Sequence, residues 1–186
     1  RALKSNTTGN YNVAVGWWAM AANTTATHNV AIGYEALKTN TIGQYNTALG
    51  MNALRLNTTG GFNHAIGTTA LYNCTTGQNN VAIGGQAMYT NTIGKDNVAM
   101  GSETLKMNTT GIENVAIGMN AMYSNTIGKQ NVAVGRRALY VTTTGQYNTA
   151  VGWHALYTNT TGERNTAVGR GAMYNSTTAN YNTGVG

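Results

Sequence analysis

Residues able to do chemistry are few and scattered in this chain. It has five acids, one cysteine (Cys74) and three histidines, which are His28, His64 and His154. No His-x-x-His or Cys-x-x-Cys spacing occurs, so we expect no metal site within one chain. No serine or threonine joins a recognisable nucleophile and base. We therefore expect no enzyme, no metal and no cofactor.

Aromatic side chains are the better candidates for binding, because a ring offers an apolar face on which a sugar can stack. Three tryptophans stand where the sequence varies most, and they are the first candidates for recognition of a surface glycan: Trp17, Trp18 and Trp153. Six tyrosines recur at a constant spacing or its multiples: Tyr72, Tyr89, Tyr123, Tyr140, Tyr157 and Tyr174. A ligand site seldom repeats six times, so these tyrosines are better explained as rings that stabilise neighbouring repeats or cover a seam between chains.

The spacing that relates these residues is a repeat of 17 residues without gaps. Its clearest marker is an asparagine at Asn12, Asn29, Asn46, Asn63, Asn80, Asn97, Asn114, Asn131, Asn148, Asn165 and Asn182. We number the unit from this asparagine, as positions one to seventeen. A strict period held over eleven copies predicts a solenoid in which each coil stacks on its neighbours. Residues 1–186 then form a single array that begins and ends within a unit, as expected of a piece of a longer fibre.

Composition excludes several function classes. The chain has 24 Gly, no Pro and only 9% charged residues. Its formal charge of +6 is dilute, with no basic run longer than Arg136-Arg137, so a nucleic-acid partner is not expected. No apolar stretch reaches the length of a membrane span. Glu35 and Glu103 share position seven but are four coils apart, which is roughly 19 Å at about 4.8 Å per coil and too far for a glycosidase pair.

The first five positions predict a short strand. They read mostly Asn, Val or Thr, Ala, an aliphatic residue and Gly, as in Asn114 to Gly118. Position four is always apolar, so we expect it to point into the coil. Asn, Ala and Gly then form a face of small residues where another backbone approaches.

The rest of the unit supplies a second core residue and a corner. Position eight is almost always Ala and position nine always Leu or Met, and good helix formers such as those in residues 34–38 allow one short helical turn here. Positions twelve to fifteen read mostly Asn-Thr-Thr-Gly or Asn-Thr-Ile-Gly. We expect the Gly at position fifteen to supply a positive φ and the stacked Asn and Thr columns to form side-chain ladders along the rod. Two large apolar side chains in each coil make a thin core, which favours assembly of several parallel chains.

The pentads at 29–33, 80–84 and 114–118 resemble the Asn-Ser-Val-Ala-Ile-Gly motif of YadA-like trimeric autotransporter adhesin heads. The longer unit, as in 148–162, is similar to repeats of phage and phage-like tail fibres. The resemblance covers essentially the whole sequence. It implies a parallel homotrimer of β-solenoids or β-rolls, located in a virion tail fibre or on a bacterial cell surface, with a host glycan or protein as partner.

The function expected from these observations is the structural shaft of a trimeric fibre involved in host attachment. One alternative is a receptor-binding module that recognises a glycan on this segment. An ice-binding solenoid is a less favoured third, because positions thirteen and fourteen should point opposite ways in a strand. Ile42, Ile93 and Ile127 also interrupt the second threonine column.

Overall fold

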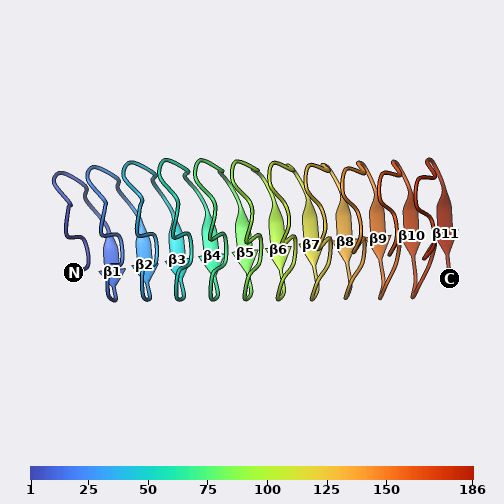
Figure 1. Cartoon of the computed structure of the whole chain (residues 1–186), viewed down its shortest axis with the longest axis horizontal. Coiled ribbons are helices and arrows are strands. Elements are labelled where there is room, and N and C mark those ends of the chain that lie inside the picture. The colour runs from blue at the N-terminus through green and yellow to red at the C-terminus, as the bar shows by residue number, and fades with distance from the viewer.

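The fold is a parallel β-solenoid, and the structure, a computed structural model, describes all of residues 1–186. Its strands are β1 (Val13–Val15), β2 (Val30–Ile32), β3 (Thr47–Leu49), β4 (His64–Ile66), β5 (Val81–Ile83), β6 (Val98–Met100), β7 (Val115–Ile117), β8 (Val132–Val134), β9 (Thr149–Val151), β10 (Thr166–Val168) and β11 (Thr183–Val185). They form one parallel sheet in chain order, and the two termini lie at opposite ends of the array (Figure 1). The predicted all-β solenoid of 17-residue coils is confirmed.

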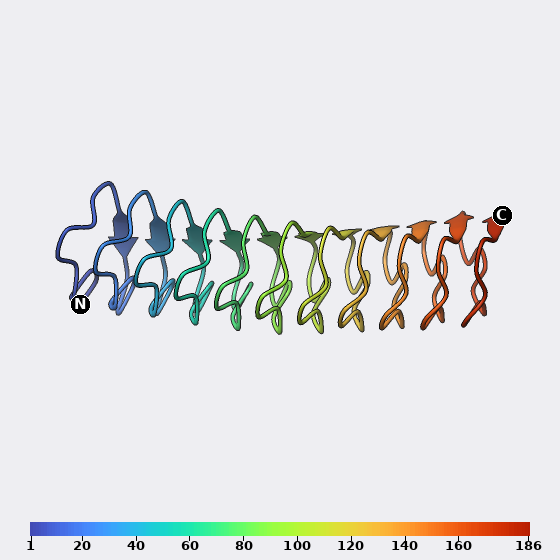
Figure 2. The same ribbon diagram turned by 90° about the horizontal axis from the view of Figure 1, so that it is seen from above.

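Successive coils stack in strict register. In the middle of the array Val115 pairs with Val132 and Ala116 with Ala133, so residues 17 apart form columns along the rod. Of 127 backbone hydrogen bonds only 20 lie within the strands, so the turns carry most of the backbone bonding. The strands occupy one side of the rod, and their sheet turns gradually about its long axis (Figure 2).

The strands face the opposite way from the prediction. Ala116 at position three is fully buried, whereas Ile117 at position four is 38% exposed. The same pattern holds from β2 to β10, where every central alanine is fully buried and the residues beside it are half-buried or exposed. The expectation that position four points into the coil is therefore wrong, and the small residues form the inner face.

Limited space in the coil explains this orientation. Position nine is fully buried from Met20 to Leu156, as predicted, and it packs directly against position three. A Cβ placed on Gly184, which stands at position three, would lie 2.6 Å from Cγ of Met173. The interior therefore has room for one large side chain, and the alternation of the strand places both of its larger residues outside.

No helical turn forms between the strands, and that prediction is wrong. Positions seven, nine and seventeen all adopt positive φ, between +48° and +59° for every residue other than glycine. Glu35 and Leu37 illustrate the first two, at φ +54° and +51°. A left-handed conformation at every second residue cannot continue a helix, and the chain bends through successive turns closed by bonds such as Ala36 N–H to Gly33 O at 3.3 Å.

The two columns of the repeat that carry mostly glycine, positions five and fifteen, have different physical roles. Position five needs glycine for its φ, which lies between +122° and +137° from Gly16 to Gly169. Position fifteen has no positive φ, so the expectation of a left-handed corner there is wrong. Glycine is favoured at position fifteen because a carbonyl of the next coil comes close, as at Gly128, where an added Cβ would lie 2.5 Å from Gly145 O.

Buried asparagines at position one link each coil to itself and to the next. The Nδ2 of Asn114 donates to Gly128 O of its own coil at 2.8 Å. Its Oδ1 accepts from the backbone N–H of Asn131 in the next coil at 3.1 Å. Both kinds of bond recur in every coil from Asn12 to Asn165, so one side chain closes the coil and sets its register.

A second buried column at position twelve is interrupted three times. Where it is continuous, Asn57 donates to Asn40 Oδ1 at 2.8 Å and Asn125 donates to Asn108 Oδ1 at 2.8 Å. The interruptions are Cys74, Thr142 and Ser176. The asparagine one coil earlier then keeps an unpaired Oδ1, at Asn57, Asn125 and Asn159. Each interruption therefore leaves one buried acceptor without a donor.

The first prediction concerns the position-one column. Asn114→Ala removes a donor and an acceptor from a buried site and leaves the backbone N–H of Asn131 unpaired, so we expect the free energy of unfolding in urea to fall by about 2–4 kcal/mol. Asn73→Ala is the matched control, because Asn73 stands at position eleven, where another coil carries Ala22. Equal losses in the two variants would contradict the importance of the column.

The second prediction is a gain of stability. Cys74→Asn supplies the missing donor to Asn57 Oδ1 and an acceptor for Asn91, so we expect the free energy of unfolding to rise by about 1–2 kcal/mol. Cys74→Ser should bring no such gain, because Ser176 leaves both its own Oγ and Asn159 Oδ1 unpaired. Thermal unfolding of the three proteins measures the difference, and a gain with serine as large as that with asparagine would refute it.

Candidate functional site

An apolar sheet face is the most extensive feature on the outside of the rod. Positions two and four of all eleven strands point outward and form two columns. Position four carries only Val, Ile, Leu or Met, with Ile66 and Val168 37% and 40% exposed. Position two carries Val or Thr, apart from the exposed His64. An apolar strip that runs the length of a protein marks an interaction surface.

The tyrosines at position ten stack along the rod. The ring centroids of Tyr72 and Tyr89 are 5.2 Å apart, and those of Tyr140, Tyr157 and Tyr174 follow at 5.2 and 4.9 Å. Cations continue the stack where tyrosine stops, since Arg55 lies over Tyr72 at 5.6 Å and Lys106 over Tyr123 at 5.5 Å. These rings give their faces to one another, which leaves mainly their edges for a ligand.

Position seventeen forms a second aromatic stack, at the N-terminal end of the array. Tyr11, His28, Tyr45 and Phe62 follow one another at centroid distances of 4.8–4.9 Å. Each is held at φ close to +58°, and stacking of about 0.5–1.5 kcal/mol per pair offsets part of that backbone cost. This column is therefore primarily structural.

One carboxylate is held by two cations. Glu35 accepts from Lys38 Nζ at 2.7 Å and from Arg55 Nε of the next coil. The hydrogen bond from Lys38 holds the pKa of the Glu35 carboxyl below its ordinary value, burial opposes this, and Arg55 reinforces it. Glu103 binds Lys106 at 3.2 Å in the same way. Both acids are occupied in ion pairs.

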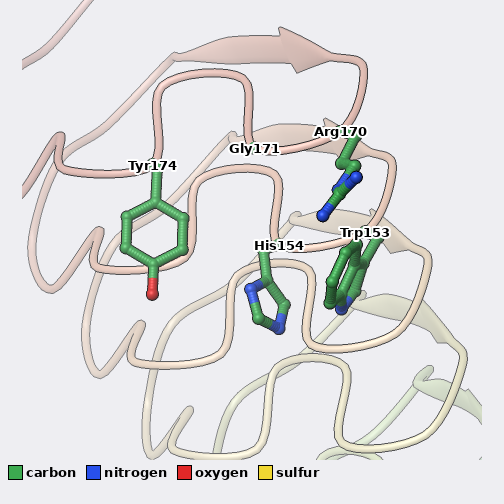
Figure 3. Close-up of a pocket in the computed structure, with 5 residues that line it drawn as sticks. All are labelled: Trp153, His154, Arg170, Gly171 and Tyr174. Carbon is green, nitrogen blue, oxygen red and sulfur yellow. The ribbon is translucent and has the colours of Figure 1, made fainter.

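A hollow on the turn side brings aromatic and basic groups together. It has a volume of about 230 Å³, and its lining residues are Trp153, His154, Arg170, Gly171 and Tyr174 (Figure 3). The guanidinium carbon of Arg170 lies 4.2 Å from the centroid of the Trp153 ring. The His154 ring is 4.6 Å from that of Trp153 and 5.8 Å from that of Tyr174. Two neighbouring coils supply these groups.

The three tryptophans that the sequence singles out as binding candidates lie in two places on the rod. Trp17 and Trp18 meet edge to face at 6.4 Å near the N-terminus, and Lys4 and Lys38 lie over Trp18 at 5.5 and 5.6 Å. Trp153 alone lies in the hollow with a histidine and an arginine. That grouping was not predicted from the sequence, although Gly171, the only glycine at position seven, was a sign of a gap in the column.

The remaining reactive groups do not form a site. No group of three or more His, Cys, Asp or Glu could hold a metal ion. Cys74 is buried, and desolvation raises the pKa of its thiol to about 12, so the thiol stays protonated near neutral pH. The structure contains no helix with the length and apolar character needed to cross a membrane.

Comparison of the chain with known protein families, curated proteins and solved structures finds no match. Function must be argued from the chain's own surfaces.

The Glu35 ion pairs generate the third prediction. Because the pKa of this carboxyl is lowered in the folded chain, its stabilisation is fully present above the ordinary value of 4.5 and is lost as pH falls through the folded value. We expect Glu35→Gln to lower the free energy of unfolding by about 1–2 kcal/mol at neutral pH and to flatten the decline of stability below about pH 4.5. Urea titrations at several pH values measure this.

Glu163→Gln is the control, because Glu163 takes part in no ion pair. An identical pH profile for Glu35→Gln and the parent chain would exclude a stabilising role for the network.

Proposed function

We propose that this chain is the structural shaft of a homotrimeric fibre that serves attachment to a host. The observation that carries the proposal is the apolar sheet face formed by positions two and four. The solenoid's own core lies on the other side of that sheet, so the chain does not cover this face itself, and a second copy has a face of the same length to place against it. Parallel copies in register would bring matching columns together.

The size of the face supports assembly. Two outward residues from each of eleven strands make 22, a number comparable to the roughly 20–30 residues that one protein contributes to a standard interface, although a trimer would divide them between two neighbours. The sheet also turns about the long axis (Figure 2), and twisted strips can wind around a common axis. Three is the number of copies that the resemblance to trimeric adhesin heads and phage-like tail fibres favours.

The same resemblance gives the proposed location and partner. A shaft of this kind belongs to a virion tail fibre or to a bacterial cell surface, and its partners are two further copies of the chain together with a host glycan or protein. The sequences that flank residues 1–186 in the encoding gene would separate the two locations.

Ice binding is disfavoured by how the threonines are used. From Thr7 to Thr160, the position-thirteen hydroxyl donates to a threonine carbonyl of the next coil, as in Thr109 Oγ1 to Thr126 O at 3.0 Å. These hydroxyls therefore hold the coils together, and a twisted face matches a flat crystal plane poorly. A thermal-hysteresis assay reading zero would remove this function, whereas a clear hysteresis would restore it.

A receptor-binding role for this segment is the second candidate function, and the hollow at Trp153 favours it. A glycan array probed with the intact protein separates it from a passive shaft. If the protein binds no glycan, the structural shaft remains as the proposed function and the receptor-binding role is rejected.

The fourth prediction tests the apolar face. Ile117→Lys puts a charge in the middle of the face, and we expect the assembled species to dissociate because burying an unpaired ammonium is costly. Sedimentation equilibrium should give three times 19.6 kDa for the parent chain and 19.6 kDa for the variant.

Ile127→Lys is the matched control, because Ile127 is 55% exposed at position fourteen, outside the sheet. This variant should remain assembled, and circular dichroism should show that both variants keep the parent's fold. A parent chain that sediments at the mass of one copy would overturn the proposal.

A further inference from the structure

The hollow at the C-terminal end of the array exists because one outward column lacks a side chain. Every other residue at position seven, from Arg1 to His154, has a side chain. At Gly171 the backbone keeps the conformation of the column, with φ +69°. A Cβ added there would meet no atom within 4 Å. Neither the turn nor a neighbour therefore requires this glycine, and its effect is to uncover the ring of His154.

Four side chains line the uncovered space. Trp153 and Arg170 form one wall, with the guanidinium stacked on the indole, and Tyr174 forms the other (Figure 3). His154 lies between them at their base, in van der Waals range of both rings. Trp153 and Tyr174 are 39% and 38% exposed, so a ligand can reach their rings from solvent.

The charges around this hollow are positive and unbalanced. The three ion pairs of the chain involve only Glu35 and Glu103, so the guanidinium of Arg170 has no carboxylate partner. Its planar fork is suited to a carboxylate. His154 Nε2 is a buried nitrogen without a hydrogen-bond partner, which is uncommon unless a ligand or water supplies one.

Electrostatics agree with this arrangement. Desolvation lowers the pKa of His154, and the charges of Arg137, Arg136 and Arg170 lower it further. The imidazole is therefore neutral near pH 7, and Nε2 can donate or accept a hydrogen bond according to its tautomer. An anion placed among these arginines would gain from all three.

We propose that the hollow lined by Trp153, His154, Arg170 and Tyr174 binds a carboxylated sugar residue. The exposed parts of the Trp153 and Tyr174 rings contact the apolar side of the sugar, and Arg170 takes the carboxylate. A volume of about 230 Å³ lies below the ~300–1,000 Å³ of pockets for drug-sized ligands, so the site accepts one sugar ring. The proposal deepens and rests on the second candidate function, and its residues lie outside the strands that form the apolar sheet face.

The fifth prediction is binding of acidic monosaccharides by the intact chain. Ligand-observed NMR with sodium glucuronate, N-acetylneuraminate and glucose should show a Kd on the order of 1 mM for at least one of the acids and much weaker binding of glucose. Which acid binds distinguishes a uronic-acid polysaccharide from a sialylated glycan as the source, and either result supports the site.

Two substitutions locate the site. Gly171→Gln should abolish binding by filling the hollow, and it should fold normally because Gln86 occupies position seven at φ +58°. Arg170→Gln should weaken binding of the acids by about 10- to 100-fold and leave that of glucose unchanged.

Matched controls make the same changes elsewhere. Gly85→Gln adds a side chain at another glycine whose Cβ direction is open, and Arg164→Gln removes an arginine stacked between Tyr147 and Tyr181. Both should bind as the parent does. Absence of binding by the parent, equal affinity for glucose, or unchanged binding by Gly171→Gln would overturn the proposal, whatever mass the protein shows in sedimentation.

Discussion

The buried amide of the position-one asparagine is the interaction on which the solenoid depends. A 17-residue coil is too narrow for a conventional hydrophobic core, so much of its interior is backbone that needs hydrogen-bond partners. One asparagine pairs backbone groups of two coils. Its Nδ2 donates to a carbonyl of its own coil, and its Oδ1 accepts from the backbone N–H of the asparagine in the next coil. A slip in register would leave several of these groups unpaired in a low-dielectric interior. The position-twelve asparagines also donate to a carbonyl of their own coil, but between coils they bond only to each other's side chains. Replacement by Cys74, Thr142 or Ser176 therefore leaves no backbone N–H of the next coil unpaired, whereas replacement at position one would.

The narrow interior also determines which side chains are exposed on the surface of the rod. With Leu or Met at position nine packed against alanines, no room is left for the Val and Ile side chains of the strand. Those residues have to face outward, and their exposure follows from the same limit on space that makes the core compact. Tyrosines and cations in the turns can satisfy each other by stacking along the rod. The sheet face has no such partner within the chain, and it is therefore the surface on which the proposed assembly rests.

The period and class of the fold were predictable from the sequence, whereas the orientation of the strand was not. Eleven copies of Asn at a constant spacing require stacked coils, and an invariant Leu or Met at position nine marks a buried site. Alternation in Asn114 to Gly118 separates two faces but does not say which one is inside, and the usual preference for burying Ile117 gave the wrong answer. That preference fails because Met122 already fills the coil. The sequence of the pentapeptide carries no information on how much space the interior has left. The positive φ at Leu37 could not be predicted from the sequence either, because leucine rarely adopts it. The hydrogen bonds and packing between neighbouring coils offset the strain of this backbone conformation.

The hollow at Gly171 was visible in the sequence only as an exception within a column. Trp153 and Tyr174 were identified as candidates, whereas His154 and Arg170 were not. The two coils that carry these residues meet only because residues 17 apart become neighbours. In a linear array each coil contacts only the next, so a change at one outward position alters the local surface without disturbing the rest. The inner columns must stay constant along the rod for the coils to stack. Positions six and seven are free of that requirement, and a single missing side chain there is enough to turn a structural column into a place where a ligand can enter.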